Sequence, residues 1–109
     1  MANDSIAMGP GKADLLKAIQ QKGSISAAAL SMGMSYKRAW DLVNTMNKSF
    51  KQAVVATSVG GGKGGGAQVT DFGLQILMQY RAIEAKANLA VKAEVSDLLL
   101  KLATGEWLI

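Results

Sequence analysis

GSISAAALSMGMSYKRAWDLVNTMN, residues Gly23 to Asn47, is the stretch that decides the fold. Its pattern predicts two short helices joined by a tight turn. We expect Ser26 to cap the first helix and Ser35 to cap the second, because hydroxyl side chains accept hydrogen bonds from the free amides of a helix start. Gly33 is expected at the turn, since glycine adopts backbone conformations that other residues avoid. This order of elements is typical of a helix-turn-helix, whose second helix is presented to DNA.

The second predicted helix has an apolar side and a polar side. Ala39, Val43, Met46 and Phe50 recur at helical spacing and are expected to face the core. The residues of the helix start and of the polar side are the candidate DNA contacts: Ser35, Tyr36, Lys37, Arg38, Asp41, Asn44 and Lys48. Arginine binds guanine and asparagine binds adenine through paired hydrogen bonds. The free amides of the helix start favour a phosphate, and Lys48 at the far end is expected to contact one as well.

Trp40 on the same helix has two interpretations that stay open. It is either a half-buried packing residue or an aromatic side chain presented to a thymine methyl group or a sugar. The core positions expected before this helix are an apolar stripe of Leu15, Leu16 and Ile19 in the segment from Lys12 to Lys22, and Ile25, Ala28, Ala29, Leu30 and Met34 in the helix-turn-helix.

Residues 53–70 predict a β-hairpin with a glycine-rich tip. AVVATSV, residues 53–59, is rich in Val, and GGGKGGG, residues 60–66, follows it. Lys63 is the one residue of this glycine segment with a side chain. The backbone can therefore approach DNA closely while a single cation reaches a phosphate or the minor groove. After a helix-turn-helix, such a hairpin is expected to be a wing.

Two other interpretations of the glycine segment compete with the wing. A phosphate-binding P-loop needs a glycine where Thr57 stands and a Ser or Thr where Gly64 stands, so the sequence argues against it. A flexible linker is the plainer alternative. The position of the segment directly after a helix-turn-helix favours the wing.

The flanking segments predict a flexible arm and two further helices. Residues 1–10 lack periodicity and hold the one proline of the chain, so we expect a flexible arm there. Lys12 to Lys22 is expected to be helical and to end at Gly23. After Thr70, the expected N-cap, apolar residues keep helical spacing to about Ala103, with a break near Asn88 as an alternative and Gly105 as the end.

This last helix is too long for one small domain to cover. At about 1.5 Å per residue, an unbroken helix would reach roughly 50 Å. Its second half therefore needs a partner surface, and pairing of two copies in a dimer is the simplest solution. The apolar end of the chain, Trp107 to Ile109, also suggests docking.

The composition of the chain excludes several classes of function. The 109 residues suffice for one small domain, and the absence of Cys and His predicts neither a metal site nor an imidazole base. The carboxylates are scattered, so we expect neither an enzyme nor a cofactor. No apolar run has the length of a membrane span or a leader, which predicts a cytoplasmic protein. The net charge is +4, and the surplus lies in residues 34–66, where five Lys or Arg oppose Asp41.

Four segments together resemble one known family. Gly23 to Ala29, Gly33 to Asp41, Met46-Asn47 and Gly61 to Gly66 are similar, in order and spacing, to the N-terminal domain of ModE-type molybdate-responsive transcription regulators. That domain is a winged helix-turn-helix related to the LysR type, and the resemblance covers roughly residues 10–86. It implies a homodimer that binds a palindromic operator in duplex DNA.

The resemblance also places individual residues. It puts Ser35, Tyr36, Lys37, Arg38 and Asp41 on the recognition helix and Lys63 on the wing. Ser24 and Ser26 complete the set of candidate DNA contacts. ModE proteins carry oxyanion-binding domains after this region, for which residues 88–109 are too few. We therefore expect no molybdate binding by this chain.

Three parts and one leading function follow from these observations. Residues 1–10 are the predicted arm, 11–87 a winged helix-turn-helix domain, and 88–109 a helical dimerisation tail. The expected function is that of a bacterial-type, sequence-specific regulator of transcription that binds duplex DNA. The alternative is a protein-interaction module on the same scaffold, with weak or lost DNA binding.

Overall fold

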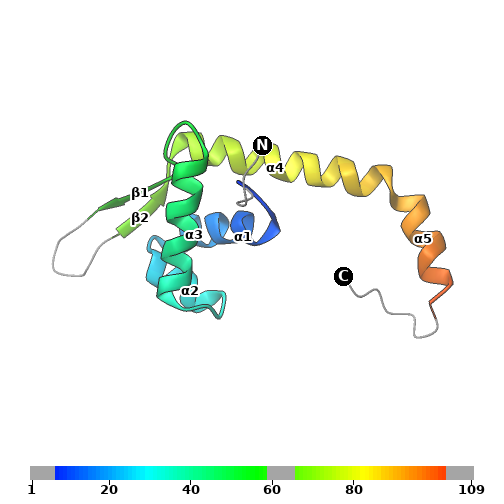
Figure 1. Ribbon diagram of the computed structural model, residues 1–109, viewed down its shortest axis with the longest axis horizontal. Coiled ribbons are helices and arrows are strands. Elements are labelled where there is room, and N and C mark those ends of the chain that lie inside the picture. Colours follow the sequence, from blue (N-terminus) through cyan, green and yellow to red (C-terminus); the bar gives the residue numbers. More distant parts are fainter. Residues whose placement is uncertain (1–6, 59–65, 103–109) are drawn as a thin grey trace.

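The computed structural model describes residues 7–58 and 66–102, and Figure 1 shows a head of packed helices from which a helical arm extends. Within these residues the elements follow in this order: α1 (Pro10–Lys22), α2 (Ile25–Ser31), α3 (Tyr36–Ser49), β1 (Val55–Ser58), β2 (Gly66–Val69), α4 (Asp71–Ala90) and α5 (Lys92–Leu100). We call residues 10–77 the head and residues 78–100 the arm. The predicted fold class, mainly α with a small hairpin and a winged helix-turn-helix arrangement, is confirmed.

Helix α1 begins at Pro10, two residues before the predicted start. Proline suits the first position of a helix, because the N–H that it lacks has no partner there. The helix ends at Gly23 as predicted, with φ of 78° and an N–H that donates to the carbonyl of Ile19 at 2.8 Å. Pro10 therefore belongs to the helix and not to an arm, and Met8 packs against the core. Residues 1–6 of the predicted arm lie outside the described residues.

Helices α2 and α3 form the predicted helix-turn-helix, with one cap misassigned. Ser24, not Ser26, caps α2: its backbone is extended, and its Oγ accepts from the amide of Ala27 at 3.0 Å. Ser26 is already the second residue of the helix. Gly33 has φ of 68° at the turn, and the Oγ of Ser35 accepts from the amide of Arg38 at 3.1 Å, as predicted.

The core of the head lies between α1, α2, α3 and the base of the hairpin. It is built from small and branched side chains, and the largest fully buried ones are Leu15, Leu16, Ile19, Met46 and Val54. The prediction for Leu30 was wrong, since its side chain is 82% exposed. It lies about 140° around α2 from buried Ile25, on the solvent side of the helix.

The inward face of α3 is the predicted one. Ala39, Val43 and Met46 are buried, and Phe50 packs edge-on against Phe72 of α4 with 6.3 Å between ring centroids. Met34 is partly buried against the core. The apolar side of α3 therefore fixes the rotation of the helix about its own axis, and the polar side faces solvent.

The two strands form an antiparallel hairpin whose base is held by the head. Val55 pairs with Val69 and Ser58 with Gly66. The amide of Ala67 donates to the carbonyl of Gly23 at 2.9 Å, which joins β2 to the turn between α1 and α2. The predicted tip with Lys63 lies outside the described residues, so its role stays a prediction.

Thr70 starts α4 as predicted, since its Oγ1 accepts from the amide of Gly73 at 2.9 Å. A Cβ on Gly73 would lie 2.2 Å from the carbonyl oxygen of Val54, so only glycine lets α4 pack this closely on the hairpin base. The long helix breaks at Val91, close to the break near Asn88 that the sequence offered as an alternative, and α5 continues the arm in a new direction (Figure 1). Gly105, the predicted end, and the apolar end of the chain lie outside the described residues.

Candidate nucleic-acid interface

The outward face of α3 gathers four of the predicted contact residues. At about 100° per residue, Lys37, Asp41, Asn44 and Lys48 fall within roughly 60° of one another, opposite the buried side of the helix. Lys37, Asp41 and Lys48 are exposed, and Asn44 is partly buried. These four side chains form a strip that runs along the length of α3, and we call it the polar strip.

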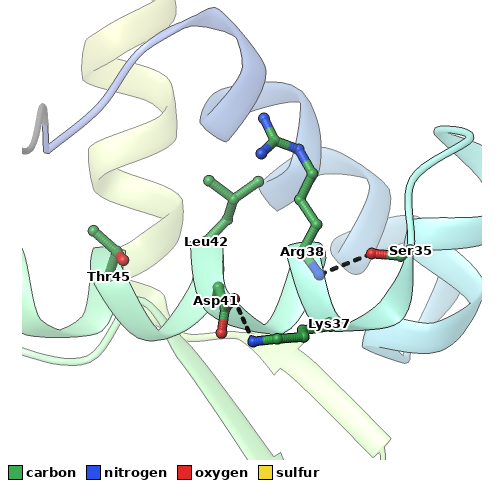
Figure 2. Close-up of a pocket in the computed structure, with 6 residues that line it drawn as sticks. All are labelled: Ser35, Lys37, Arg38, Asp41, Leu42 and Thr45. Carbon is green, nitrogen blue, oxygen red and sulfur yellow. Dashed lines mark hydrogen bonds and ion pairs between the residues drawn. The ribbon is translucent and has the colours of Figure 1, made fainter.

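Two residues at the start of the polar strip, Lys37 and Asp41, form an ion pair. Lys37 Nζ lies 3.1 Å from Asp41 Oδ2, and their side chains are 84% and 56% exposed (Figure 2). An exposed pair four residues apart on a helix is worth only about 0.3–0.5 kcal/mol. Lys37 can therefore exchange this carboxylate for a base or a phosphate at little cost.

Arg38 lies on a different flank of α3, directed toward the start of α1. Figure 2 shows its guanidinium pointing away from Lys37 and Asp41. Hollows of about 290 and 260 Å³ border it, the second between Gly9, Gly11 and Leu42. Within the described residues, its guanidinium makes no hydrogen bond or ion pair. Arg38 thus does not share the strip of Lys37, and its position suits a contact at the edge of a DNA groove.

The opposite flank of α3 faces the hairpin and is aromatic. Tyr36 and Trp40 line a groove of about 440 Å³ whose other wall comprises Ile25, Ser26, Thr57, Ser58, Gly66 and Ala67. Trp40 is 44% exposed. Trp40 is thus about half-buried, as its first interpretation expects, and its contact with a thymine methyl group or a sugar stays a prediction.

The remaining predicted contacts divide between the two flanks. Ser24 is occupied as the cap of α2, whereas Ser26 is exposed and lines the aromatic groove. Ser35 uses its Oγ to cap α3 and borders the hollow beside Arg38. No geometry can be given for Lys63, which lies outside the described residues.

Sequence reasoning gave Asn47 no role of its own, although it contacts the hairpin directly. Its Oδ1 accepts from the amides of Val54 and Val55 at 2.8 and 3.1 Å, and its Nδ2 donates to the carbonyl of Val55 at 3.0 Å. Asn47 precedes Val54 by seven residues and Val55, the first residue of β1, by eight, and no sequence rule connects these spacings with a contact.

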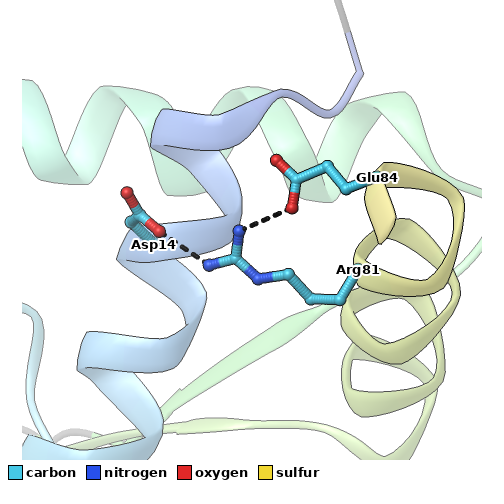
Figure 3. A network of polar contacts seen from close by, with 3 residues as sticks. All are labelled: Asp14, Arg81 and Glu84. Atoms are coloured by element: carbon cyan, nitrogen blue, oxygen red, sulfur yellow. Dashed lines mark hydrogen bonds and ion pairs between the residues drawn. The ribbon is translucent and has the colours of Figure 1, made fainter. Parts of the chain in front are cut away.

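A charged cluster behind the strip joins α1 to α4. Arg81 donates to Asp14 Oδ1 at 2.6 Å and to Glu84 Oε1 at 3.0 Å (Figure 3). These hydrogen bonds, that to Asp14 first, raise the pKa of Arg81, which therefore keeps its charge. The ion pair between Arg81 and Asp14 joins α4 to α1, in addition to the apolar contacts near the start of α4. Elsewhere in residues 7–58 and 66–102, no three His, Cys, Asp or Glu side chains come together as a metal would need, and none of the described helices has the length and apolarity to cross a membrane.

The helix-turn-helix, hairpin and long helix define the class of this domain as a winged helix-turn-helix. The LysR-type regulator LysG of Corynebacterium glutamicum, with bound effector Arg, matches 87% of this chain and 30% of its own at a TM-score of 0.57 and 22% identity. ArgP of Mycobacterium tuberculosis matches 80% of this chain and 32% of its own at a TM-score of 0.52 and 20% identity. At such identities, the likeness shows the fold alone.

Sequence comparison then gives named relatives. The molybdenum transport protein ModE of Azotobacter vinelandii is 40% identical over 92 residues, which are 84% of this chain and 34% of the relative. The molybdenum-pterin-binding protein MopB of Rhodobacter capsulatus is 49% identical over 78 residues, 72% of this chain and 29% of the relative. The DNA-binding transcriptional dual regulator ModE of Escherichia coli K12 is 42% identical over 71 residues, which are 65% of this chain and 27% of the relative.

These matches relate the chain to the N-terminal domain of the ModE-type transcription regulators, in agreement with the resemblance of the four motif segments. The chain spans about a third or less of the length of these relatives. A comparison with models of protein families finds no match.

Proposed function

We propose that this chain is a DNA-binding regulator of transcription that recognises a specific duplex sequence through α3. The single observation that carries the proposal is the polar strip of α3. The strip faces solvent and lies beside a hairpin, in a domain that is related to ModE. In this arrangement the N-terminal end of α3 enters a major groove, and the hairpin reaches the adjacent minor groove.

The chemistry of the strip fits base recognition with few charges. Asn44 can bind adenine, Asp41 can accept from the amino group of cytosine, and Lys37 can donate to guanine once its ion pair opens. Lys48 at the far end and Arg38 on its separate flank suit phosphates, which position the helix without selecting a sequence. This division differs from the sequence-based expectation that Arg38 reads a base.

We further propose that the regulator is a homodimer joined through its arm. Large apolar side chains along the arm are exposed within the described chain: Met78, Ile83, Leu89, Val91, Leu98 and Leu100. Pairing of two arms would remove this surface from water and would place two copies of α3 on one palindromic operator, as two-fold symmetry requires. The dimerisation role expected of residues 88–109 is part of this proposal.

A second candidate function is favoured by the same exposed residues. The arm could instead bind a different protein, with the head as its carrier. The double substitution Ile83→Glu with Leu89→Glu separates the two cases. If self-association and duplex binding both survive, the arm serves another protein; if self-association is lost, it is the dimer interface.

The names of the relatives suggest which genes this chain regulates. Several of them are named for molybdenum transport or for a molybdenum pterin, so we expect the DNA sites of this chain near genes of molybdenum metabolism. A regulator of this kind acts in the cytoplasm, without catalysis of its own and without a cofactor. Genome-wide mapping of its binding sites tests this context.

Duplex binding itself is tested by titration at two salt concentrations. A duplex selected by the chain from a random library should bind more tightly than a shuffled duplex of the same length, and its affinity should fall steeply between about 50 and 300 mM salt, because counterions are released. Equal affinity for both duplexes, or binding that salt leaves unchanged, would reject the proposal.

A further inference from the structure

The base of the hairpin is joined to α3 by one side chain. The carboxamide of Asn47 meets two successive amides and one carbonyl of Val54 and Val55, at 2.8 to 3.1 Å. Within the part of the chain that the structure describes, every hydrogen bond between α3 and the hairpin comes from this residue. Val54 and Val55 are both buried, so water cannot replace these bonds without opening the core.

The hairpin needs such an anchor, because two four-residue strands have little stability of their own. Other bonds hold it to the rest of the head. The amide of Ala67 reaches Gly23, and Thr70 donates to the carbonyls of Ala53 and Val54 from the start of α4. None of these bonds reaches α3, although Val54 and Val55 share the buried core with Val43 and Met46. Asn47 adds the directional hydrogen bonds that join the hairpin base to α3.

Asn47 also lies on the flank of α3 that matters for the geometry of the interface. It follows Tyr36 by eleven residues and Trp40 by seven, so all three lie within about 40° of one another around the helix. Tyr36 and Trp40 line the groove toward the hairpin. Asn44, on the polar strip, is only about 60° away. A change at Asn47 therefore shifts the hairpin relative to both the aromatic groove and the polar strip.

We propose that Asn47 is a positioning residue for DNA recognition, which sets the spacing between α3 and the hairpin so that both reach neighbouring grooves of one duplex at the same time. This inference rests on the proposed function. Its consequence is specific: loss of the amide uncouples the two elements, so discrimination between sequences falls while attraction to phosphates persists.

The test compares two variants with a control in the full chain. Asn47→Leu keeps the number and branching of the side-chain heavy atoms and removes all three bonds. Asn47→Asp keeps an oxygen acceptor for both amides. Leu15→Val removes one buried methylene group far from the polar strip. The affinity of each is measured for the selected duplex and for its shuffled counterpart. We expect the ratio of the two affinities to fall about 10- to 100-fold in Asn47→Leu and to stay within about threefold of the parent in Asn47→Asp and Leu15→Val.

A second measurement needs no DNA. Residual dipolar couplings of backbone amides report the orientation of the hairpin relative to α3, and hydrogen exchange reports the protection of the Val54 and Val55 amides. We expect Asn47→Leu to change the orientation and lose the protection. If the parent chain binds no duplex, the proposed function fails, while the couplings still decide whether Asn47 holds the hairpin.

Three outcomes would overturn the inference: an unchanged affinity ratio in Asn47→Leu, an equal fall of the ratio in Leu15→Val, or unchanged couplings. If Asn47→Leu does not fold, Asn47→Gln replaces it. Its longer side chain keeps the same hydrogen-bonding groups and displaces the hairpin, so a folded variant with an altered orientation and a reduced ratio supports the inference, and a ratio equal to that of the parent refutes it.

Discussion

Helices α3 and α4 both carry regularly spaced apolar residues, yet they use them differently. On α3 the apolar residues occupy one side and are buried, while polar residues occupy the other. On α4 only Gly73 and Leu77, near its start, are buried, and α5 buries none of its residues. The core of this small head thus ends within two turns of α4. Beyond Leu77, Tyr80 still packs against the core, but most of the large apolar side chains that follow are exposed in the described chain, which is the basis for the proposed intermolecular surface.

The largest contrast is expected from truncating one apolar residue in each region. Met46 is fully buried, so Met46→Ala should lower the free energy of unfolding by about 2–5 kcal/mol. Leu89 is 70% exposed, so Leu89→Ala should change the unfolding of the monomer by less than about 0.5 kcal/mol. Urea denaturation at a low protein concentration measures both. Equal losses would mean that the arm folds against the head.

Substitutions of exposed apolar residues in the arm are expected to weaken dimerisation and to leave the stability of the monomer unchanged. Ile83→Glu places a charge on a residue that is 64% exposed in the monomer and would be covered in a dimer. Sedimentation should show monomers at concentrations where the parent is dimeric, with affinity for a palindromic duplex reduced about 10- to 100-fold. Ala82→Glu, at an exposed neighbouring position, is the control for charge alone. Parent chains that sediment as monomers would refute the proposed dimer.

Within the head, the two serines of α2 form a matched pair. Ser24→Ala removes the cap and should cost about 1 kcal/mol of stability. Ser26→Ala removes an exposed hydroxyl and should cost less than about 0.5 kcal/mol. Thermal unfolding of both variants checks the assignment, and the reverse order would restore Ser26 as the cap.

The smallest effect is expected on the polar strip. Asp41→Asn removes a negative charge from the face proposed to meet DNA and releases Lys37 from its ion pair. Affinity for a shuffled duplex should rise about two- to fivefold at low salt, and stability should fall by no more than about 0.5 kcal/mol. A loss of affinity for every duplex would show that the carboxylate orders Lys37 for binding.

How much of this could be predicted depended on the range of each interaction. The turn at Gly33, the cap at Ser35 and the inward side of α3 depend on neighbours within a few residues, and the sequence pattern predicts them. Ser24 and Ser26 have the same side chain at the same helix start, so only the backbone decides between them. Leu30 was misplaced because a seven-residue helix shows its period only twice.

The role of Asn47 and the flank of Arg38 lay beyond sequence reasoning for a different reason. Asn47 bonds to amides that reach it only once the hairpin packs on the head. Arg38 is separated from Lys37 by one position, but that step of about 100° moves it to the side of α1. Which residues are polar could be predicted, whereas which of them act together required the packed head.

The most direct test of the central claim is an NMR titration of the chain with the selected duplex, followed through its backbone amides and side chains. If α3 and the hairpin bind DNA, shifts should concentrate at Lys37, Asp41, Asn44 and Lys48 and along β1 and β2, while residues 78–100 stay unchanged. Shifts that spare α3 and gather on the arm, or no shifts at low salt, would contradict it.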